Sequence, residues 1–345
     1  MSDASSRGRW LAFAALPVLA AVGLYMVGPR PAPATLPAEA PDAGHDLVAL
    51  EARINASEAA FPNIKPDNHA RIIWADASSK TRTDCSVVYL HGFSASQGEG
   101  EPMHREFAQR YGCNLFLARL DGHGLDTPMP LIDITADSLI ASAVDAIGIG
   151  QSLGEHVYIM ATSTGGTLAL PLVAKHGGVD GLILYSPNIR VSHPLMFLAS
   201  KPWGLRIGRM AAGGKFVDSA PKTEEVAQYW QSNYRVEALV AVQNLVASTM
   251  KKETFKQVDI PVFVGAYYQD KENQDNTVSV KAMRKMFGHL ATADENKRLI
   301  EFAEVGAHPL ASKYTSEDLA SVRDETFLFA EEVLGLKPVT PVVLP

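Results

Sequence analysis

The sequence predicts an α/β fold in which helices cover both faces of a mostly parallel β-sheet. Short runs rich in β-branched and aromatic residues alternate with longer stretches of helical periodicity, and this alternation is typical of parallel sheets. With 345 residues, 47% hydrophobic and 20% charged, the chain can bury a sizeable core. The expected strands are residues 86–91, 114–120, 156–161, 181–187, 260–268 and 298–305, and the expected helices are 101–111, 135–147, 164–175, 279–289 and 316–334.

The charge of the chain bears on its partners. The formal net charge is -7 and the sequence pI is about 5.8. No basic field is available for a phosphate backbone, so we do not expect nucleic-acid binding. A small neutral or apolar substrate is expected instead, and the sequence does not predict an oligomeric state.

An uncharged run at residues 10–28, WLAFAALPVLAAVGLYMVG, predicts a membrane anchor helix. At 1.5 Å per residue its 19 residues nearly match a hydrocarbon core of about 30 Å. Arg7 and Arg9 precede the run, and acidic residues follow it, so the catalytic part is expected on the periplasmic or extracytoplasmic side. The alternative is a signal peptide cleaved at Ala32-Pro33-Ala34, which would give a secreted protein.

The domain boundaries follow from this anchor. Residues 1–9 would be a cytoplasmic tail, 10–28 the anchor, and 29–45 a linker rich in proline and alanine. The folded domain is expected over 46–340. It would include a cap at about 188–258, because the 72 residues between the strands ending in SP and beginning with IP far exceed an ordinary connection.

The chain has two cysteines, Cys85 and Cys113, too few for a zinc site. Each precedes a strand-like run. If those strands are parallel neighbours, the cysteines lie about 5 Å apart at the same end of the sheet, within disulfide reach. A disulfide is therefore a possible pairing, with two buried free thiols as the alternative.

Two serines compete as a candidate nucleophile. GQSLG fits G-x-S-x-G around Ser152, whereas ATSTG around Ser163 has Ala161 in place of the first glycine. A nucleophile elbow needs a strand, a sharp turn and a helix. We expect the helix before Ser152 to end at Gly148 and Gly150, which would leave this serine in a helix-to-strand loop. Ser163 follows a strand and precedes a helix, and it is therefore the predicted nucleophile.

The remaining parts of a serine hydrolase site follow other strands. His91-Gly92-Phe93 comes directly after the first strand, so the backbone N–H groups of Phe93 and Thr164 are candidate oxyanion donors. Later strands end in a loop with Asp270 and Asp275 and in a loop with His308.

The order serine, acid, histidine, together with HGFSAS, ARLDGHG, ATSTGG and GAH, resembles the α/β-hydrolase superfamily over about residues 80–335. The resemblance is strongest to its serine aminopeptidase S33-like or monoglyceride-lipase-like branch. It implies a helical cap after the sixth strand and Ser163, His308 and Asp275 as the triad, with Asp270 as the alternative acid. His91, Gly92 and Gly165 would support the motifs, and Asp121 and His123 would form a structural loop beside the site.

The implied reaction is acyl transfer through an acyl-enzyme, without a metal or an organic cofactor. A membrane-anchored esterase acting on lipid-like monoesters, of the carboxylesterase or lipase class, is the first expectation. An aminopeptidase is the second, and it would need a cap carboxylate, for which Glu224 and Glu225 are candidates. The third is an inactive hydrolase fold that serves as a binding or scaffold module.

Overall fold

The computed structural model describes residues 22–40, 42, 44, 46–221 and 223–339. Its core is a seven-stranded sheet of order β1-β3-β2-β4-β5-β8-β9, in which only the β1–β3 pair is antiparallel. All six predicted strands are present. The strands are β1 (Arg71–Ile73), β2 (Thr83–Leu90), β3 (Asn114–Leu117), β4 (Gly154–Thr162), β5 (Gly181–Tyr185), β8 (Val262–Tyr267) and β9 (Lys297–Phe302).

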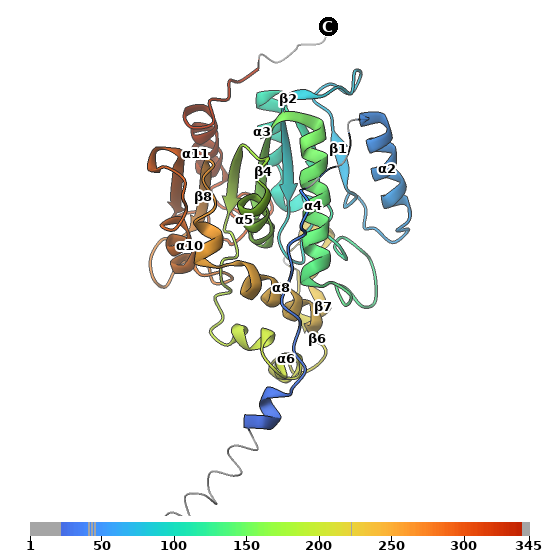
Figure 1. Cartoon of the computed structure of the whole chain (residues 1–345), viewed down its shortest axis with the longest axis vertical. Helices are drawn as coiled ribbons and strands as arrows, with labels where there is room; N and C mark the ends of the chain where they lie inside the picture. The colour runs from blue at the N-terminus through green and yellow to red at the C-terminus, as the bar shows by residue number, and fades with distance from the viewer. Residues whose placement is uncertain (1–21, 41, 43, 45, 222, 340–345) are drawn as a thin grey trace, which may run out of the picture.

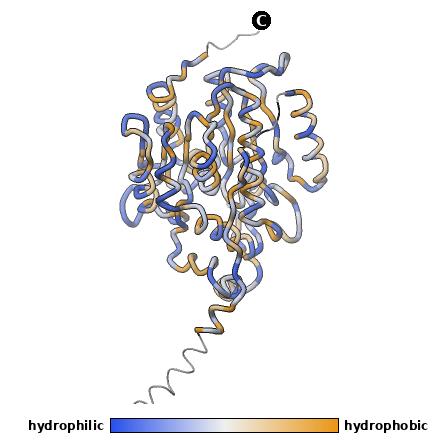
Figure 2. Tube along the Cα trace, in the orientation of Figure 1, coloured by the Kyte–Doolittle hydropathy of each residue, from blue (hydrophilic) through white to orange (hydrophobic). Residues whose placement is uncertain are grey.

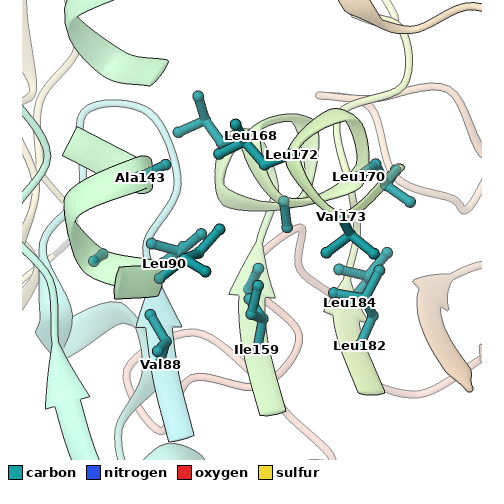
Figure 3. Close-up of a cluster of buried hydrophobic side chains, with 14 of the residues drawn as sticks. Val88, Leu90, Ala143, Ile159, Leu168, Leu170, Leu172, Val173, Leu182 and Leu184 are labelled. Atoms are coloured by element: carbon teal, nitrogen blue, oxygen red, sulfur yellow. The ribbon is translucent and has the colours of Figure 1, made fainter. Parts of the chain in front are cut away.

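Helices cover both faces of the sheet (Figure 1). One face packs against α4 (Ala136–Leu153), α5 (Thr164–His176) and α10 (Val280–Phe287), and the other against α3 (Met103–Tyr111) and α11 (Leu319–Glu332). Strand residues alternate between the two resulting cores: Val88 and Leu90 belong to the first, Val87 and Tyr89 to the second. Figure 3 shows the first core, where leucines of α5 meet Leu90, Ile159 and Leu184 of the sheet.

Helix α4 is longer than predicted. It continues through Gly148 and Gly150 to Leu153, so the expected end near residue 147 is wrong. A Cβ on Gly150 would lie 2.3 Å from a methyl group of Val88 on β2. This glycine therefore serves close packing of the helix on the sheet rather than helix termination.

The N-terminal part of the fold contains two elements that the sequence pattern did not predict. Helix α2 (Leu47–Ala59) is capped by Asp46, whose carboxylate accepts the backbone N–H groups of Val48 and Ala49 at 3.0 Å. Strand β1 follows it and adds the antiparallel edge of the sheet. The described chain thus has a helix from residue 47, and the domain boundary expected at residue 46 stays a prediction.

The described part of the proline-rich segment at residues 29–40 has no helix or strand, and it does not run free of the body. Asn244 donates to the Ala32 carbonyl at 2.8 Å, and the Ala34 amide donates to Ser248 Oγ at 2.9 Å, both on α8 (Val236–Thr249). Further along, the Thr35 amide donates to Asp137 on α4 at 2.9 Å. Figure 1 shows this dark-blue segment running along α8 and α4. The expected linker is thus in part a strap bound to the catalytic domain.

The predicted disulfide is present. Cys85 on β2 and Cys113, which precedes β3, form a bond with their Cα atoms 4.7 Å apart. The parallel pairing of β2 with β3 brings the two positions together, as expected from the order of the strands.

The cap lies between β5 and β8. It contains η2 (Met196–Ser200), α6 (Gly204–Ala211), α7 (Glu224–Tyr229), α8 and α9 (Lys252–Phe255). It is not wholly helical, because β6 (Phe216–Asp218) pairs with β7 (Asn233–Arg235) in a separate antiparallel sheet. The cap also follows the fifth strand of the described chain rather than the sixth, since only β1 precedes β2.

The expected anchor falls largely outside the described residues, which begin at residue 22, and so does the expected tail at 1–9. Residues 22–26 are helical and hydrophobic, as Figure 2 shows for the segment that leaves the body beyond α6. Within the described part of the chain, no helix has the length and apolar character needed to cross a membrane.

Candidate active site

Ser163 occupies a sharp turn between a strand and a helix. Strand β4 ends at Thr162 and α5 begins at Thr164, which leaves the serine as the single residue of the turn. Its backbone has φ 52° and ψ -112°, a left-handed conformation that is unfavourable for a residue with a Cβ. A hydrogen bond from the Ser163 amide to the Tyr185 carbonyl on β5, at 2.9 Å, stabilises this conformation. The predicted elbow geometry is therefore present.

The glycine after the elbow is required by close packing. A Cβ on Gly165 would lie 2.0 Å from the carbonyl oxygen of Leu90, the last residue of β2. Ala161, which replaces the first glycine of the motif, is fully buried within β4 and pairs with Leu90 in the sheet register. The alanine is accommodated because its position is regular strand, whereas Gly165 meets neighbouring backbone.

Ser152 is not at an elbow. It lies in the last turn of α4, not in the loop that the sequence pattern predicted. Its hydroxyl donates to the Gly44 carbonyl at 2.6 Å and to the Gly148 carbonyl at 3.1 Å. The Ser152 hydroxyl connects α4 to the N-terminal segment. Although its sequence fits G-x-S-x-G, this serine is not in a strand-turn-helix elbow.

Asp275 and His308 form a close buried pair. Nδ1–H of His308 donates to Oδ2 of Asp275 at 2.6 Å, and the aspartate is only 3% exposed. The other carboxylate oxygen accepts the backbone N–H groups of Thr277 at 2.9 Å and Val278 at 3.0 Å. The hydrogen bond at Nδ1 fixes the imidazole and leaves Nε2 as the nitrogen able to take a proton.

The two groups shift each other's pKa in opposite directions. Burial raises the pKa of Asp275, but the charge of His308 and three hydrogen bonds outweigh it and hold the pKa below its ordinary value. Burial lowers the pKa of His308, and the charge and hydrogen bond of Asp275, with a further contribution from Glu99, raise it above 6.5. The pair is therefore arranged to stabilise an imidazolium.

Asp270, the alternative acid, is exposed and bonded only within its own loop. Its carboxylate accepts the amides of Glu272 and Asn273 at 2.8 Å and the Asn273 side chain at 2.9 Å. The structure brings Asp275, not Asp270, to the histidine.

The candidate oxyanion donors flank the nucleophile. Phe93 follows Gly92 directly after β2, and Thr164 is the first residue of α5. Among the described residues, the backbone N–H groups of Phe93 and Thr164 donate to no protein acceptor. A Cβ on Gly92 would lie 3.2 Å from Cβ of Ser163, so this loop and the elbow are in contact.

Two buried histidines support the loop. His91 Nδ1–H donates to the Gly92 carbonyl at 2.9 Å, and its Nε2 accepts the Leu120 amide at 3.1 Å. His123 donates to the Asp121 carbonyl at 2.8 Å, and its ring lies 5.0 Å from that of His91. Burial lowers the pKa of both histidines, to about 4 for His123. Both histidines are therefore neutral structural groups. Asp121 contributes its backbone carbonyl, which accepts the hydrogen bond from His123.

A cleft of about 420 Å³ opens between the cap and the loops that carry the acid and the base. Its walls combine apolar, aromatic and polar side chains, both from cap residues 219–221, 226, 230–232 and 234 and from loops of the body. The lining residues include Ser94, Trp230, Tyr234, Tyr267, Thr277 and His308.

Glu99 is a buried acidic residue of the site that the sequence pattern did not reveal. It lies in η1 (Gln97–Gly100), is 3% exposed, and accepts the backbone N–H of Gly92 at 2.5 Å. No motif marks an acid eight residues after His91, and only the folded chain shows that this one turns inward.

Comparison with known proteins agrees with this geometry. A sequence profile of the family described as "Serine aminopeptidase, S33" matches residues 81–318. No curated protein matches the chain.

Solved structures with a similar fold include several lipolytic enzymes. A structure of the metagenome-derived lipolytic enzymes LipS and LipT is 18% identical with a TM-score of 0.60, covering 77% of this chain and 98% of that one. A soluble variant of monoglyceride lipase from Saccharomyces cerevisiae, in complex with a substrate analogue, is 14% identical with a TM-score of 0.54, covering 79% and 92%. The substrate-analogue complex of DcsB is 16% identical with a TM-score of 0.54, covering 79% and 98%.

At these identities the solved structures show a shared fold, while the family profile spans most of the chain and includes the elbow, the acid and the base. The chain belongs to the serine aminopeptidase S33 family of the α/β-hydrolase superfamily.

Proposed function

We propose that this hydrolase cleaves carboxylic esters through a serine acyl-enzyme, with Ser163, His308 and Asp275 as the triad. The observation that carries the proposal is the buried Asp275–His308 pair, joined at 2.6 Å, in a fold whose strained β4–α5 turn presents a serine. Family membership supports a hydrolase, and the lipolytic enzymes among the structural neighbours favour an ester as the substrate.

The proposed mechanism assigns each group one task. Nε2 of His308 accepts the Ser163 proton as the hydroxyl oxygen attacks the ester carbonyl, and Asp275 stabilises the imidazolium that forms. The amides of Phe93 and Thr164 hold the oxyanion. His308 then returns the proton to the leaving alcohol, and a water molecule repeats the sequence to release the acid.

The cleft favours a substrate with an apolar portion. Aromatic groups of the cap, Trp230 and Tyr234, face the same cavity as His308. Phe93 packs edge-on against Tyr234, with 5.0 Å between the ring centroids, so the candidate oxyanion loop lies against the cap. An acyl chain or aryl group can bury apolar surface here, which supports a lipid-like monoester.

The first test is covalent labelling of the full-length, detergent-solubilised chain with a fluorophosphonate, followed by peptide mass analysis. The expected adduct is on Ser163, lost in Ser163→Ala and retained in Ser152→Ala. Esters of increasing acyl length would then be compared with aminoacyl substrates. An adduct on Ser152 would refute the elbow assignment, and a folded protein without any adduct would favour a binding or scaffold module.

The aminopeptidase alternative would need a cap carboxylate to bind the amino group of a peptide, and the two candidate glutamates do not reach the cleft. Glu224 and Glu225 are exposed in the first turn of α7, next to the capping Thr223, and neither lines the cleft. Carboxylates at a helix N-terminus are favourable there without any ligand. Faster turnover of aminoacyl amides than of esters would nevertheless overturn the ester assignment.

We also propose that residues 10–28 anchor the enzyme in a membrane, with the catalytic domain on the extracytoplasmic side. The described end of this run is held against the cap: the Trp203 amide donates to the Pro29 carbonyl at 2.9 Å, and its indole N–H donates to the Leu24 carbonyl at 3.3 Å. Nearby on η2 and α6, Phe197 is 52% and Met210 is 82% exposed. The disulfide favours an oxidising compartment.

Membrane fractionation tests the anchor. The full chain should remain in the membrane pellet after alkaline extraction, with an intact N-terminus by mass spectrometry. Leu16→Arg combined with Leu19→Arg, which places charges inside the run, should release it. An N-terminus that begins after Ala34 would instead show that the run is a cleaved signal peptide.

A further inference from the structure

Glu99 places a carboxyl group beside Ser163, although the mechanism above gives it no role. A Cβ on Gly92 would lie 2.8 Å from Oε1 of Glu99 and 3.2 Å from Cβ of Ser163. The Glu99 carboxyl group and the Ser163 side chain therefore both lie next to Gly92. A charge on this carboxyl would lie next to the loop that carries the Phe93 amide, one of the two proposed oxyanion donors.

The carboxyl group also holds the oxyanion loop. Its Oε2 accepts the Gly92 amide at 2.5 Å and the Tyr89 hydroxyl at 3.4 Å. The Gly92 amide immediately precedes the Phe93 amide, so a bond that fixes the first orients the second.

Among the described residues, the group that can become a cation and acts on Glu99 is His308 rather than a lysine or an arginine. In the described part of the chain Glu99 forms no ion pair with lysine or arginine. The side chains that act on the Glu99 carboxyl group are Tyr89 on β2, Trp230 from the cap, and His308 after β9. His104 on α3 packs against Tyr89, and burial lowers its pKa to about 4, which keeps it neutral.

This environment changes the titration of the carboxyl group. Burial raises the pKa of Glu99 to about 7, against a backbone hydrogen bond and the charge of His308, which lower it. The group is therefore part protonated near neutral pH, and its titration is coupled to that of His308.

We propose, resting on the acyl transfer proposed above, that Glu99 is a positioning residue whose neutral form supports the reaction and whose ionised form opposes it. In either form it accepts the Gly92 amide and keeps the Phe93 amide aimed at the oxyanion. Only the ionised form adds a second negative charge next to the oxyanion in a desolvated site. The same charge attracts the His308 imidazolium, but Glu99 is bonded to the loop that carries the Phe93 amide, so we expect the repulsion of the oxyanion to dominate and to slow acylation on the order of 10-fold.

The pH dependence of fluorophosphonate labelling of the full-length chain tests this proposal, from about pH 5.5 to about pH 9. The wild-type rate should fall as the pH rises through about 7, where Glu99 ionises. Glu99→Gln is close in shape, stays neutral and keeps an oxygen that accepts the Gly92 amide. It should label at least as fast as the wild type near pH 6, where less of its His308 is protonated, and show no alkaline fall. Its acid limb should move to lower pH, because the negative charge that raises the pKa of His308 is gone.

Two further variants separate charge from positioning. Glu99→Leu is neutral but has no acceptor for the Gly92 amide, so it should label more slowly than Glu99→Gln at every pH. Glu106→Gln is the matched control, because Glu106 pairs with Arg323 at the surface and is 37% exposed. Its labelling profile should match the wild type.

The outcomes are distinct. A wild-type rate that does not fall at alkaline pH, or the same fall in folded Glu99→Gln, overturns the electrostatic role. Equal rates in Glu99→Leu and Glu99→Gln overturn the positioning role. Failure of the folded wild type to label at any pH contradicts the proposed serine chemistry itself and is thereby distinguished from failure of this inference.

Discussion

His308 donates through Nδ1 to Oδ2 of Asp275 at 2.6 Å, although 33 residues separate them in the sequence. Asp275→Asn should lower kcat by about 10³- to 10⁴-fold, because a neutral amide cannot stabilise the imidazolium or fix its tautomer. Ester turnover and fluorophosphonate labelling measure the loss. Asp270→Asn is the control and should change either rate by less than roughly threefold. Comparable losses in the two variants would contradict the assignment of the acid.

The acid limb of the activity profile should report His308. The pKa of this imidazole is raised above 6.5, chiefly by Asp275 once the opposing effect of burial is overcome. The base is therefore protonated, and inactive, as the pH falls through that raised pKa. The kcat/KM of the wild type should fall about tenfold per pH unit below it. A rate that stays constant down to about pH 5 would exclude His308 as the base.

Gly165→Ala should damage both the fold and the site. The added methyl group would meet the Leu90 carbonyl oxygen at 2.0 Å, so β2 or α5 must move. We expect a loss of about 1–3 kcal/mol in the free energy of unfolding, measured in urea, with strongly reduced labelling of Ser163. Gly288→Ala is the matched control, because its methyl group would come no closer than 3.6 Å to its neighbours. Unchanged stability and labelling in Gly165→Ala would refute the packing argument.

The disulfide should contribute substantially to stability. Cys85 and Cys113 are separated by 28 positions, and a crosslink of that span restricts the unfolded chain by about 3–4 kcal/mol. Replacing both cysteines by serine should lower the free energy of unfolding by that order, and reduction of the wild type should do the same. Non-reducing peptide mapping of protein from an oxidising compartment checks the bond directly, and two free thiols there would remove the prediction.

The sequence predicted the parallel sheet because each of its six main strands is a local run of β-branched or aromatic residues followed by a helical period. It also separated Ser163 from Ser152, since the order strand, turn and helix is a local property of the chain. For the acid of the triad, the sequence left two candidate aspartates in one loop. The choice between Asp270 and Asp275 depended on which of them reaches His308, and local pattern does not contain that distance.

Other features depended on contacts between distant segments. Helix α4 runs through two glycines because Gly150 packs against Val88 on β2, a reason that helical periodicity does not reveal. The proline-rich strap is extended by composition, but its binding to Asn244 and Ser248 required the cap to fold back beside it.

The sequence alone thus determined the succession of the six main strands and the helices between them, together with the elbow position of Ser163, because hydrophobic periodicity is a local property of the chain. It left the two cysteines either paired or free. Only the tertiary structure decided which aspartate meets the histidine and that Glu99 is buried beside Ser163. An acidic residue in a glycine-rich loop has the same sequence signature whether it faces water or the interior. Desolvation, and with it the pKa, is set by what the rest of the chain packs around it.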